Sequence, residues 1–115
     1  CLVGSEMCIR DSYYTCNLRD GKNLSDAYLA SNAELKLAHS KGSKSSSVLI
    51  RPASGTNAAE FPFDFVRLFT NPSFTNWGEA VDGWYDNVRG SAESNNVRDT
   101  YDCNGSTLFT GRIVR

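Results

Sequence analysis

One segment, FPFDFVRLF at residues 61–69, constrains the fold more than any other part of the chain. Alternate positions carry four phenylalanines and Arg67, and the positions between them include Val66 and Leu68. Both faces of the expected strand are therefore largely apolar, which is typical of a central strand covered on both sides. We therefore predict a β-sheet in which this segment is a central strand.

Two segments predict helices that accompany this sheet. In residues 23–40, Asn23 can cap the helix, and Asp26 interacts favourably with the helix dipole. The expected apolar face of this helix consists of Leu24, Ala27, Tyr28, Ser31, Leu35 and Ala38. Ser73 is the expected cap of the second helix, whose apolar stripe is Phe74, Trp77, Val81, Trp84 and Val88. The polar stretch at 89–102 leaves room for one further short helical turn.

Three further strands are expected, over residues 13–18, 47–51 and 107–115, with a tight turn at 102–106. The element order is then β-α-β-β-α-β, the pattern of two split βαβ units. Right-handed crossovers predict a ferredoxin-like α+β fold, with an antiparallel sheet in the order 4-1-3-2 and both helices on one face. A rival interpretation, a short doubly wound α/β domain, needs more helices than the sequence provides.

The first twelve residues, CLVGSEMCIRDS, show no structural pattern. Back-translated with ordinary codons, they resemble the transposase end sequence of a sequencing adapter. We therefore expect residues 1–12 to be non-native and residues 13–115 to form a single domain. This origin is typical of an environmental sequence fragment whose natural N-terminus is missing, so a signal peptide cannot be judged. The alternative is a natural N-terminal arm.

Two cysteines, Cys16 and Cys103, remain in residues 13–115 and lie 103 − 16 = 87 positions apart. In the predicted sheet, the end of the first strand lies beside the start of the fourth, which brings the two cysteines together. We therefore predict a Cys16–Cys103 disulfide and, with it, an exported protein, either periplasmic or secreted. The alternative is two buried thiols in a cytosolic domain. A zinc site would need more ligands, because His39 is the only histidine.

Composition narrows the class of partner. Without the first twelve residues the chain has 12 − 1 = 11 basic and 13 − 2 = 11 acidic residues, and the charges are interspersed. A neutral domain of this kind is not expected to bind nucleic acid or an anionic membrane. No apolar run approaches the roughly 20 residues that a membrane span requires. A hydrophobic content of 40% indicates a globular core instead.

Two helices cover only one face of the predicted sheet, so the other apolar face predicts a homodimer packed sheet to sheet. In this arrangement the sequence resembles the dimeric α/β-barrel superfamily, which includes antibiotic-biosynthesis-type monooxygenases. The stretches TCNLRDGKNLSD (15–26) and PSFTNWGEAVDGW (72–84) are similar to small uncharacterised exported proteins of marine bacteria. The resemblance implies a ligand site between the sheet and the helices or the partner subunit.

Two residues are candidates for ligand binding. Arg67, in mid-strand among phenylalanines, must be paired or must bind something anionic or a carbonyl. Its structural alternative is an ion pair with Asp64, with Glu60 or with a dimer partner. Tyr14 is the second candidate, because Tyr13 and Tyr14 alternate across the first strand and one of them faces the open side. Its alternative is cross-strand packing.

Three other residues favour structural roles. His39 is expected to interact with the carbonyls at the end of the first helix, although the resemblance would also allow a haem ligand or a general base. Trp77 and Trp84 are seven positions apart and are expected to pack in the core, the alternative being that they line an aromatic pocket. No catalytic, cofactor-binding or metal-binding residue is predicted.

The leading hypothesis for function is a small exported dimeric domain that binds a small apolar or anionic ligand without a cofactor. One alternative is a cofactor-independent monooxygenase of the antibiotic-biosynthesis type. Another is a structural or interaction module. The sequence shows no nucleophile and base pair that would decide for an enzyme.

Overall fold

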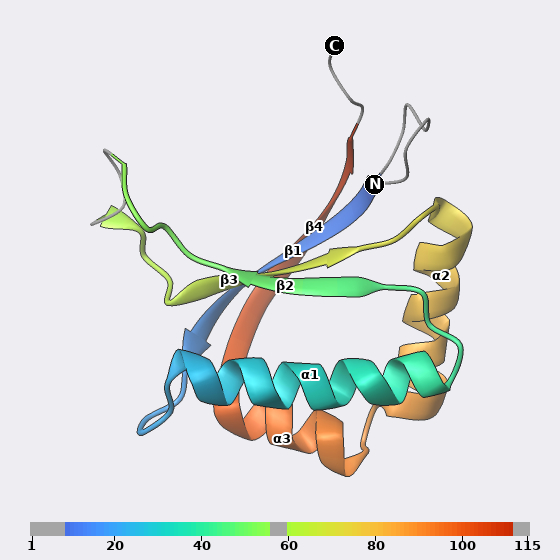
Figure 1. The fold of residues 1–115 in the computed structure, drawn as a ribbon, viewed down its shortest axis with the longest axis horizontal. Helices are drawn as coiled ribbons and strands as arrows, with labels where there is room; N and C mark the ends of the chain where they lie inside the picture. The colour runs from blue at the N-terminus through green and yellow to red at the C-terminus, as the bar shows by residue number, and fades with distance from the viewer. Residues whose placement is uncertain (1–8, 56–59, 112–115) are drawn as a thin grey trace.

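The computed structural model describes residues 9–55 and 60–111, and Figure 1 shows their arrangement. A four-stranded antiparallel sheet has the order β2-β3-β1-β4, so that β3 and β1 are the central strands. The elements are β1 (Ile9–Leu18), α1 (Leu24–Ser40), β2 (Ser46–Ile50), β3 (Phe65–Thr70), α2 (Phe74–Gly83), the π-helical segment η2 (Trp84–Val88), α3 (Ala92–Thr100) and β4 (Tyr101–Gly111). The predicted α+β class and the four-stranded antiparallel sheet are confirmed.

The connection between β3 and β4 differs from the prediction. In place of one helix it contains α2, η2 and α3, so the elements do not follow the expected βαββαβ order one for one. Ser73 caps α2 as predicted, and Ser91 caps α3, because each accepts a hydrogen bond from a backbone N–H three residues later. Figure 1 shows α1 and α3 side by side on one side of the sheet, with α2 standing at one end.

Helix α1 begins as predicted. Asn23 accepts a hydrogen bond from the Asp26 backbone N–H, and the Asp26 carboxylate accepts one from the Asn23 backbone N–H. This capping box satisfies two N–H groups that a helix start leaves unpaired. The buried face is wrong in part, because it consists of Ala27, Ala30, Ser31 and Glu34, while Tyr28 is exposed. The small side chains in this stripe let the helix approach the sheet closely.

Strand β3 is shorter than the predicted strand at 61–69 and begins at Phe65. Pro62 has no backbone N–H to donate to a neighbouring strand. Phe61 and Phe63 pack edge to face instead, with ring centroids 5.8 Å apart. Asp64 marks the entry into the sheet, where its carboxylate accepts a 2.7 Å hydrogen bond from the Leu18 backbone N–H.

Strand β4 starts earlier than predicted, at Tyr101, and the expected tight turn at 102–106 is wrong. The pairing with β1 shifts between Thr15, opposite Asn104, and Tyr13, opposite Thr107. The extra residue forms a β-bulge at Gly105, whose φ of +63° is in the left-handed region that favours glycine. The end of the predicted last strand, at 112–115, lies outside the described residues.

The core lies between the sheet and α1. The Cys16–Cys103 disulfide joins residues that face each other in β1 and β4, with Cα atoms 4.0 Å apart, which confirms the predicted pairing. Cys16 and Phe65 are completely buried, and the Phe65 ring meets the Tyr101 ring edge to face at 5.0 Å between centroids. Cys16 therefore places one end of the disulfide inside the core, and the partly buried Cys103 packs against it.

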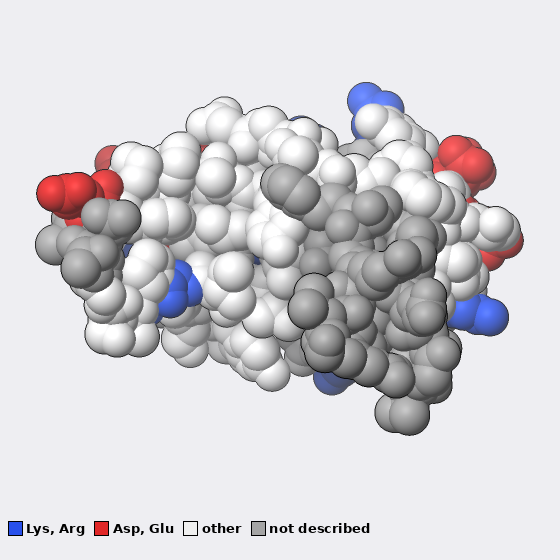
Figure 2. All heavy atoms as spheres, turned by 90° about the horizontal axis from the view of Figure 1, so that it is seen from above, with Lys and Arg blue, Asp and Glu red and all other residues white. Residues whose placement is uncertain are grey.

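The opposite face of the sheet is not covered by a helix in Figure 1. Val48 and Ile50 of β2 are 47% and 41% exposed there, and Val66 and Leu68 of β3 lie beside them. Figure 2 looks down on this side and shows the acidic and basic side chains gathered mainly toward its ends. We call Val48, Ile50, Val66 and Leu68 the open-face patch.

Most of the segment that resembles an adapter is not described. Residues 1–8 lie outside the described residues, and β1 begins at Ile9. Ser12, the last residue of the segment, is buried, and its hydroxyl accepts a 3.1 Å hydrogen bond from the Trp77 indole N–H. This contact ties α2 to β1.

Candidate functional site

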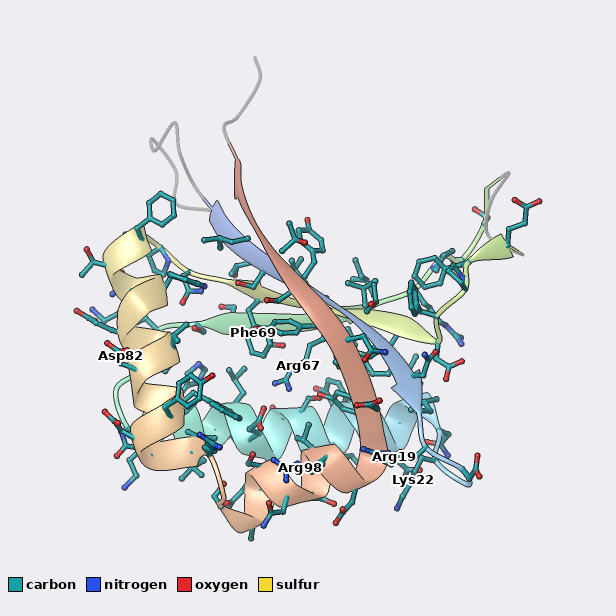
Figure 3. The ribbon with its side chains drawn as sticks, turned by 180° about the vertical axis from the view of Figure 1, so that it is seen from behind. Arg19, Lys22, Arg67, Phe69, Asp82 and Arg98 are labelled. Carbon is teal, nitrogen blue, oxygen red and sulfur yellow. A yellow bond between two sulfur atoms is a disulfide. The ribbon has the colours of Figure 1, made fainter. Side chains whose placement is uncertain are left out.

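Arg67 is the central residue of the candidate site. It lies in β3 on the face that α1 covers, and only 5% of it is exposed. Figure 3 shows its side chain pointing from the sheet toward α1. Burying an arginine is costly unless its charge and its N–H groups find partners.

A carboxylate on α1 supplies the countercharge. Nη1 of Arg67 donates to Oε1 of Glu34 over 2.9 Å, and both side chains are less than a tenth exposed. Nη1 also donates to the Tyr101 hydroxyl over 2.8 Å, and Nε donates to the Ser47 hydroxyl over 3.2 Å. The guanidinium thus links β3 to α1, β2 and the start of β4.

The Tyr101 phenol keeps its proton in this setting. Burial raises its pKa above the ordinary 10.0, against the opposing effects of Arg67 and of the hydrogen bond to Ser31. Its oxygen already accepts an N–H from Arg67, so the hydroxyl proton is available to the Ser31 hydroxyl, 2.6 Å away. Tyr101 therefore connects Arg67 to Ser31 of α1 through two hydrogen bonds.

One nitrogen of Arg67 is left over. Nη2 is buried and has no hydrogen-bond partner among the described residues. The guanidinium carbon lies 4.3 Å from the centroid of the Phe69 ring, a cation–π contact that compensates a buried charge only partly. An unpaired buried donor in an otherwise satisfied network is uncommon and requires an explanation.

Tyr14 and Arg67, the two residues proposed from the sequence, are brought together. They face each other across β1 and β3, and the Tyr14 ring packs edge to face on Phe69 at 5.7 Å between centroids. Tyr14 therefore lies on the helix side of the sheet, while its neighbour Tyr13 pairs with Leu68 on the open side. The candidate site consists of Arg67, Glu34, Tyr101 and Phe69, with Tyr14 at its edge.

Arg67 is ion-paired, as the structural alternative predicted, but the partner is Glu34 and not one of the two acids named from the sequence. Asp64 binds the Leu18 backbone N–H, and Glu60 is exposed in the preceding loop. The sequence did not predict Glu34 as a partner, because the buried face of the helix was predicted from its apolar residues alone. Glu34 lies seven residues after Ala27 and four after Ala30, so it is on the same face of α1 as these buried residues. This helical spacing is the sequence feature that could have identified it.

His39 and the two tryptophans have partners outside the site. Nε2 of His39 donates to the Ser45 carbonyl oxygen over 2.7 Å, which closes the loop after α1. The Trp77 indole holds Ser12, and the Trp84 ring packs edge to face on Tyr85 at 5.2 Å. Both tryptophans are partly exposed, so the predicted full core packing is too strong.

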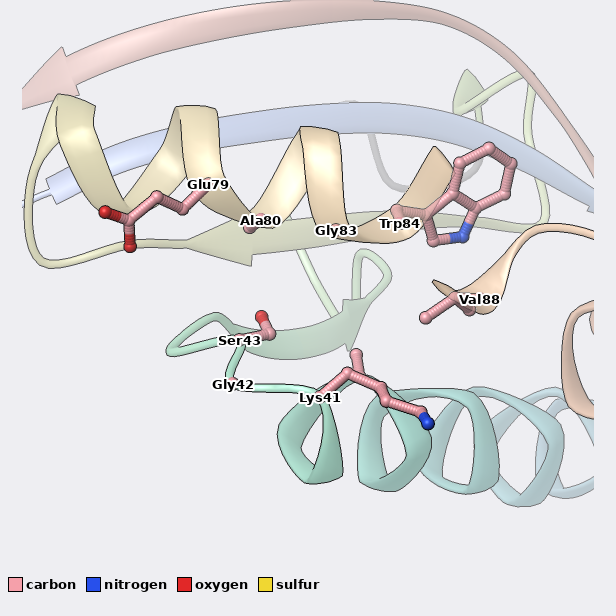
Figure 4. A pocket seen from close by; sticks show the side chains of 9 residues that line it. Lys41, Gly42, Ser43, Glu79, Ala80, Gly83, Trp84 and Val88 are labelled. Atoms are coloured by element: carbon pink, nitrogen blue, oxygen red, sulfur yellow. The ribbon is translucent and has the colours of Figure 1, made fainter. Parts of the chain in front are cut away.

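A small hollow of about 160 Å³ lies between the end of α1 and α2. Figure 4 shows the end of α1 and its following loop on one side and α2 on the other. Its lining residues are Ala38, Lys41, Gly42, Ser43, Glu79, Ala80, Gly83, Trp84 and Val88. Ala38 follows Glu34 by four residues, so the hollow begins about 6 Å further along the same side of α1.

Within residues 9–55 and 60–111, no cluster of three or more His, Cys, Asp or Glu side chains has the arrangement of a metal site. No helix in this part of the chain is long and apolar enough to span a membrane. No protein-family model matches the chain, and no curated protein is significantly similar to it. The proposals below therefore depend on the geometry of the site.

Proposed function

We propose that this chain is a small exported domain that binds a small ligand between the sheet and its helices, with Arg67 as the residue that holds the polar end. The observation that carries the proposal is the buried Nη2 of Arg67, a donor without a partner. A bound molecule would supply the missing acceptor and remove the cost of leaving this donor unpaired.

The hollow can hold the part of the ligand that does not contact Arg67. Its wall contains Trp84, the small apolar residues Ala38 and Ala80, and the buried Val88. Drug-sized ligands occupy roughly 300–1,000 Å³. At about 160 Å³, the hollow fits a smaller molecule, with a short apolar body whose polar group reaches toward Arg67.

We also propose that the fold is ferredoxin-like, with an enlarged second crossover. Read from the β4 edge, the sheet order is β4-β1-β3-β2, and α1 and α3 share one side of the sheet. The Cys16–Cys103 disulfide supports export to an oxidising compartment, either periplasmic or secreted, because such bonds are rare in the cytosol.

The working unit we propose is a homodimer, formed sheet to sheet through the open-face patch. Four aliphatic side chains on two adjacent strands make this patch, and the acidic and basic side chains visible in Figure 2 lie mainly toward the ends of that side. Two copies can therefore meet there about a two-fold axis without burying charged groups. The partner's sheet would then cover the second apolar face of β3.

Filling the hollow is expected to abolish ligand binding. In Ala80→Leu the larger side chain occupies the space against Trp84, while Ala33→Leu makes the same change on the exposed surface of α1. Native mass spectrometry of protein produced in an oxidising compartment should show extra small-molecule mass on the wild type and on Ala33→Leu, and none on Ala80→Leu. A wild type that carries no extra mass, or an Ala80→Leu variant that retains it, would contradict the proposal.

A charge in the open-face patch is expected to separate the dimer. Leu68→Glu places a carboxylate in the middle of the proposed interface, where burying it is unfavourable. The same spectra should give twice the 12.7 kDa chain mass for the wild type and a single chain for the variant. Ala33→Glu, on the exposed surface of α1 away from the open face, is the control and should remain dimeric. A monomeric wild type would rule the dimer out and leave the Arg67 site untouched.

A further inference from the structure

We infer that the polar group held by Arg67 is an uncharged carbonyl oxygen, as in an amide or a ketone, and not a carboxylate or phosphate. This inference rests on the proposed function and names the ligand chemistry at the same site. It departs from the usual expectation that a buried arginine selects anions.

The charge balance of the site is the first argument. Arg67 carries one positive charge, and the Glu34 carboxylate, 2.9 Å from Nη1, carries one negative charge. The Tyr101 hydroxyl between them and Ser31 is neutral, because burial raises its pKa. An anionic ligand would give the buried site a net negative charge, which is strongly unfavourable away from water. A neutral acceptor leaves the net charge of the site at zero.

The hydrogen-bond inventory is the second argument. Of the five N–H groups of a guanidinium, three are used by Glu34, Tyr101 and Ser47, and the two on Nη2 remain. The site therefore lacks an acceptor for these two N–H groups. A carbonyl oxygen has two lone pairs and can accept a hydrogen bond from this nitrogen without adding a charge.

The aromatic neighbours are the third argument. The guanidinium carbon lies over the Phe69 ring, 4.3 Å from its centroid, and Tyr14 packs edge to face on that ring. This wall favours a flat group placed alongside Arg67. A planar amide or ketone fits such a space, while a tetrahedral phosphate needs room above and below the plane.

The test compares two probes of the same shape that differ in charge, acetamide and acetate. The ¹⁵N-labelled full chain is titrated with each probe, and the Arg67 Nη resonances are followed by NMR, with Arg67→Lys used to assign them. We expect acetamide to shift these resonances in the wild type, and acetate to bind on the order of tenfold more weakly.

Glu34→Gln should invert this preference. The variant keeps a side-chain oxygen for Arg67 but removes the countercharge, so the site becomes positive and acetate should bind more tightly than acetamide. Glu93→Gln, a partly exposed carboxylate on α3 outside the site, is the control and should leave the preference for acetamide unchanged. The wild-type comparison decides the question alone if Glu34→Gln does not fold.

The outcomes separate the two proposals. If acetate shifts the Arg67 resonances of the wild type as strongly as acetamide or more strongly, the inference of an uncharged ligand fails while the binding site stands. If neither probe shifts them in any variant, the proposed ligand site at Arg67 fails as well.

Discussion

Reduction of the Cys16–Cys103 disulfide is expected to lower the free energy of unfolding by roughly 4–5 kcal/mol. The two residues are 87 positions apart, so the bond closes most of the chain into one loop and removes conformations mainly from the unfolded state. It also joins the central strand β1 to the edge strand β4 inside the core. The reduced protein is expected to fold weakly or not at all.

The measurement is urea unfolding followed by tryptophan fluorescence, with and without a phosphine reductant. A Cys1→Ser/Cys8→Ser background leaves Cys16 and Cys103 as the only cysteines. In this background, the Cys16→Ala/Cys103→Ala variant is the matched control. If the cross-link itself stabilises the fold, the variant should resemble the reduced protein and should not respond to the reductant. A reductant effect below about 1 kcal/mol would show that the bond contributes little to stability.

Glu34→Leu is expected to lower the free energy of unfolding by about 3–5 kcal/mol. The change leaves the Arg67 guanidinium, which is 5% exposed, without a countercharge. A buried charge that has lost its partner is strongly destabilising, because no water or opposite charge compensates it.

A double-mutant cycle separates the stability contribution of the Glu34–Arg67 ion pair from that of the surrounding residues. Glu34→Leu/Arg67→Met replaces both charges by apolar groups, and such replacements are often close to neutral for stability. We expect the double variant to recover most of the loss seen in Glu34→Leu. Glu79→Leu, an exposed carboxylate on α2, is the control and should change stability by less than about 0.5 kcal/mol. A double variant as unstable as Glu34→Leu would show that the charge pair is not the cause.

Local sequence signals predicted several elements well. The Asn23 capping box and the Ser73 cap depend on side chains within three residues of the backbone groups that they bind, so the sequence alone defines them. The disulfide followed from topology, because an antiparallel β1 and β4 place Cys16 opposite Cys103. These features need only short-range chemistry or the order of the strands.

The candidate site was only half predictable. Arg67 stood out because a charge among phenylalanines needs a partner, and its cross-strand neighbour Tyr14 was also proposed. Glu34 lies 33 positions away on another element, and a charged residue within a buried helix face has no strong signal of its own. The pairing depends on how α1 is rotated against the sheet, which the packing of Ala27 and Ala30 determines.

The early start of β4 was missed for a related reason. The residues DCNGS have the composition of a turn, yet Cys103 and Asn104 pair with β1, and Gly105 accommodates the extra residue without reversing the chain. Glycine in the left-handed region serves turns and bulges equally well. Whether such a glycine forms a turn or a bulge depends on whether a neighbouring strand pairs with the residues on both sides of it.

The bulge at Gly105 also divides β4 into two halves of opposite parity. Before it, odd-numbered residues such as Cys103 face the core; after it, Thr107 pairs with Tyr13 of the open side, and Leu108 pairs with Ser12 of the core side. Loss of the one extra residue here would restore a regular ladder, and the residues beyond it would keep their partners in β1. In an alignment of related chains, a gap placed at this point would therefore leave the inner and outer faces unchanged, whereas a gap elsewhere in β4 would exchange the faces of the residues beyond it.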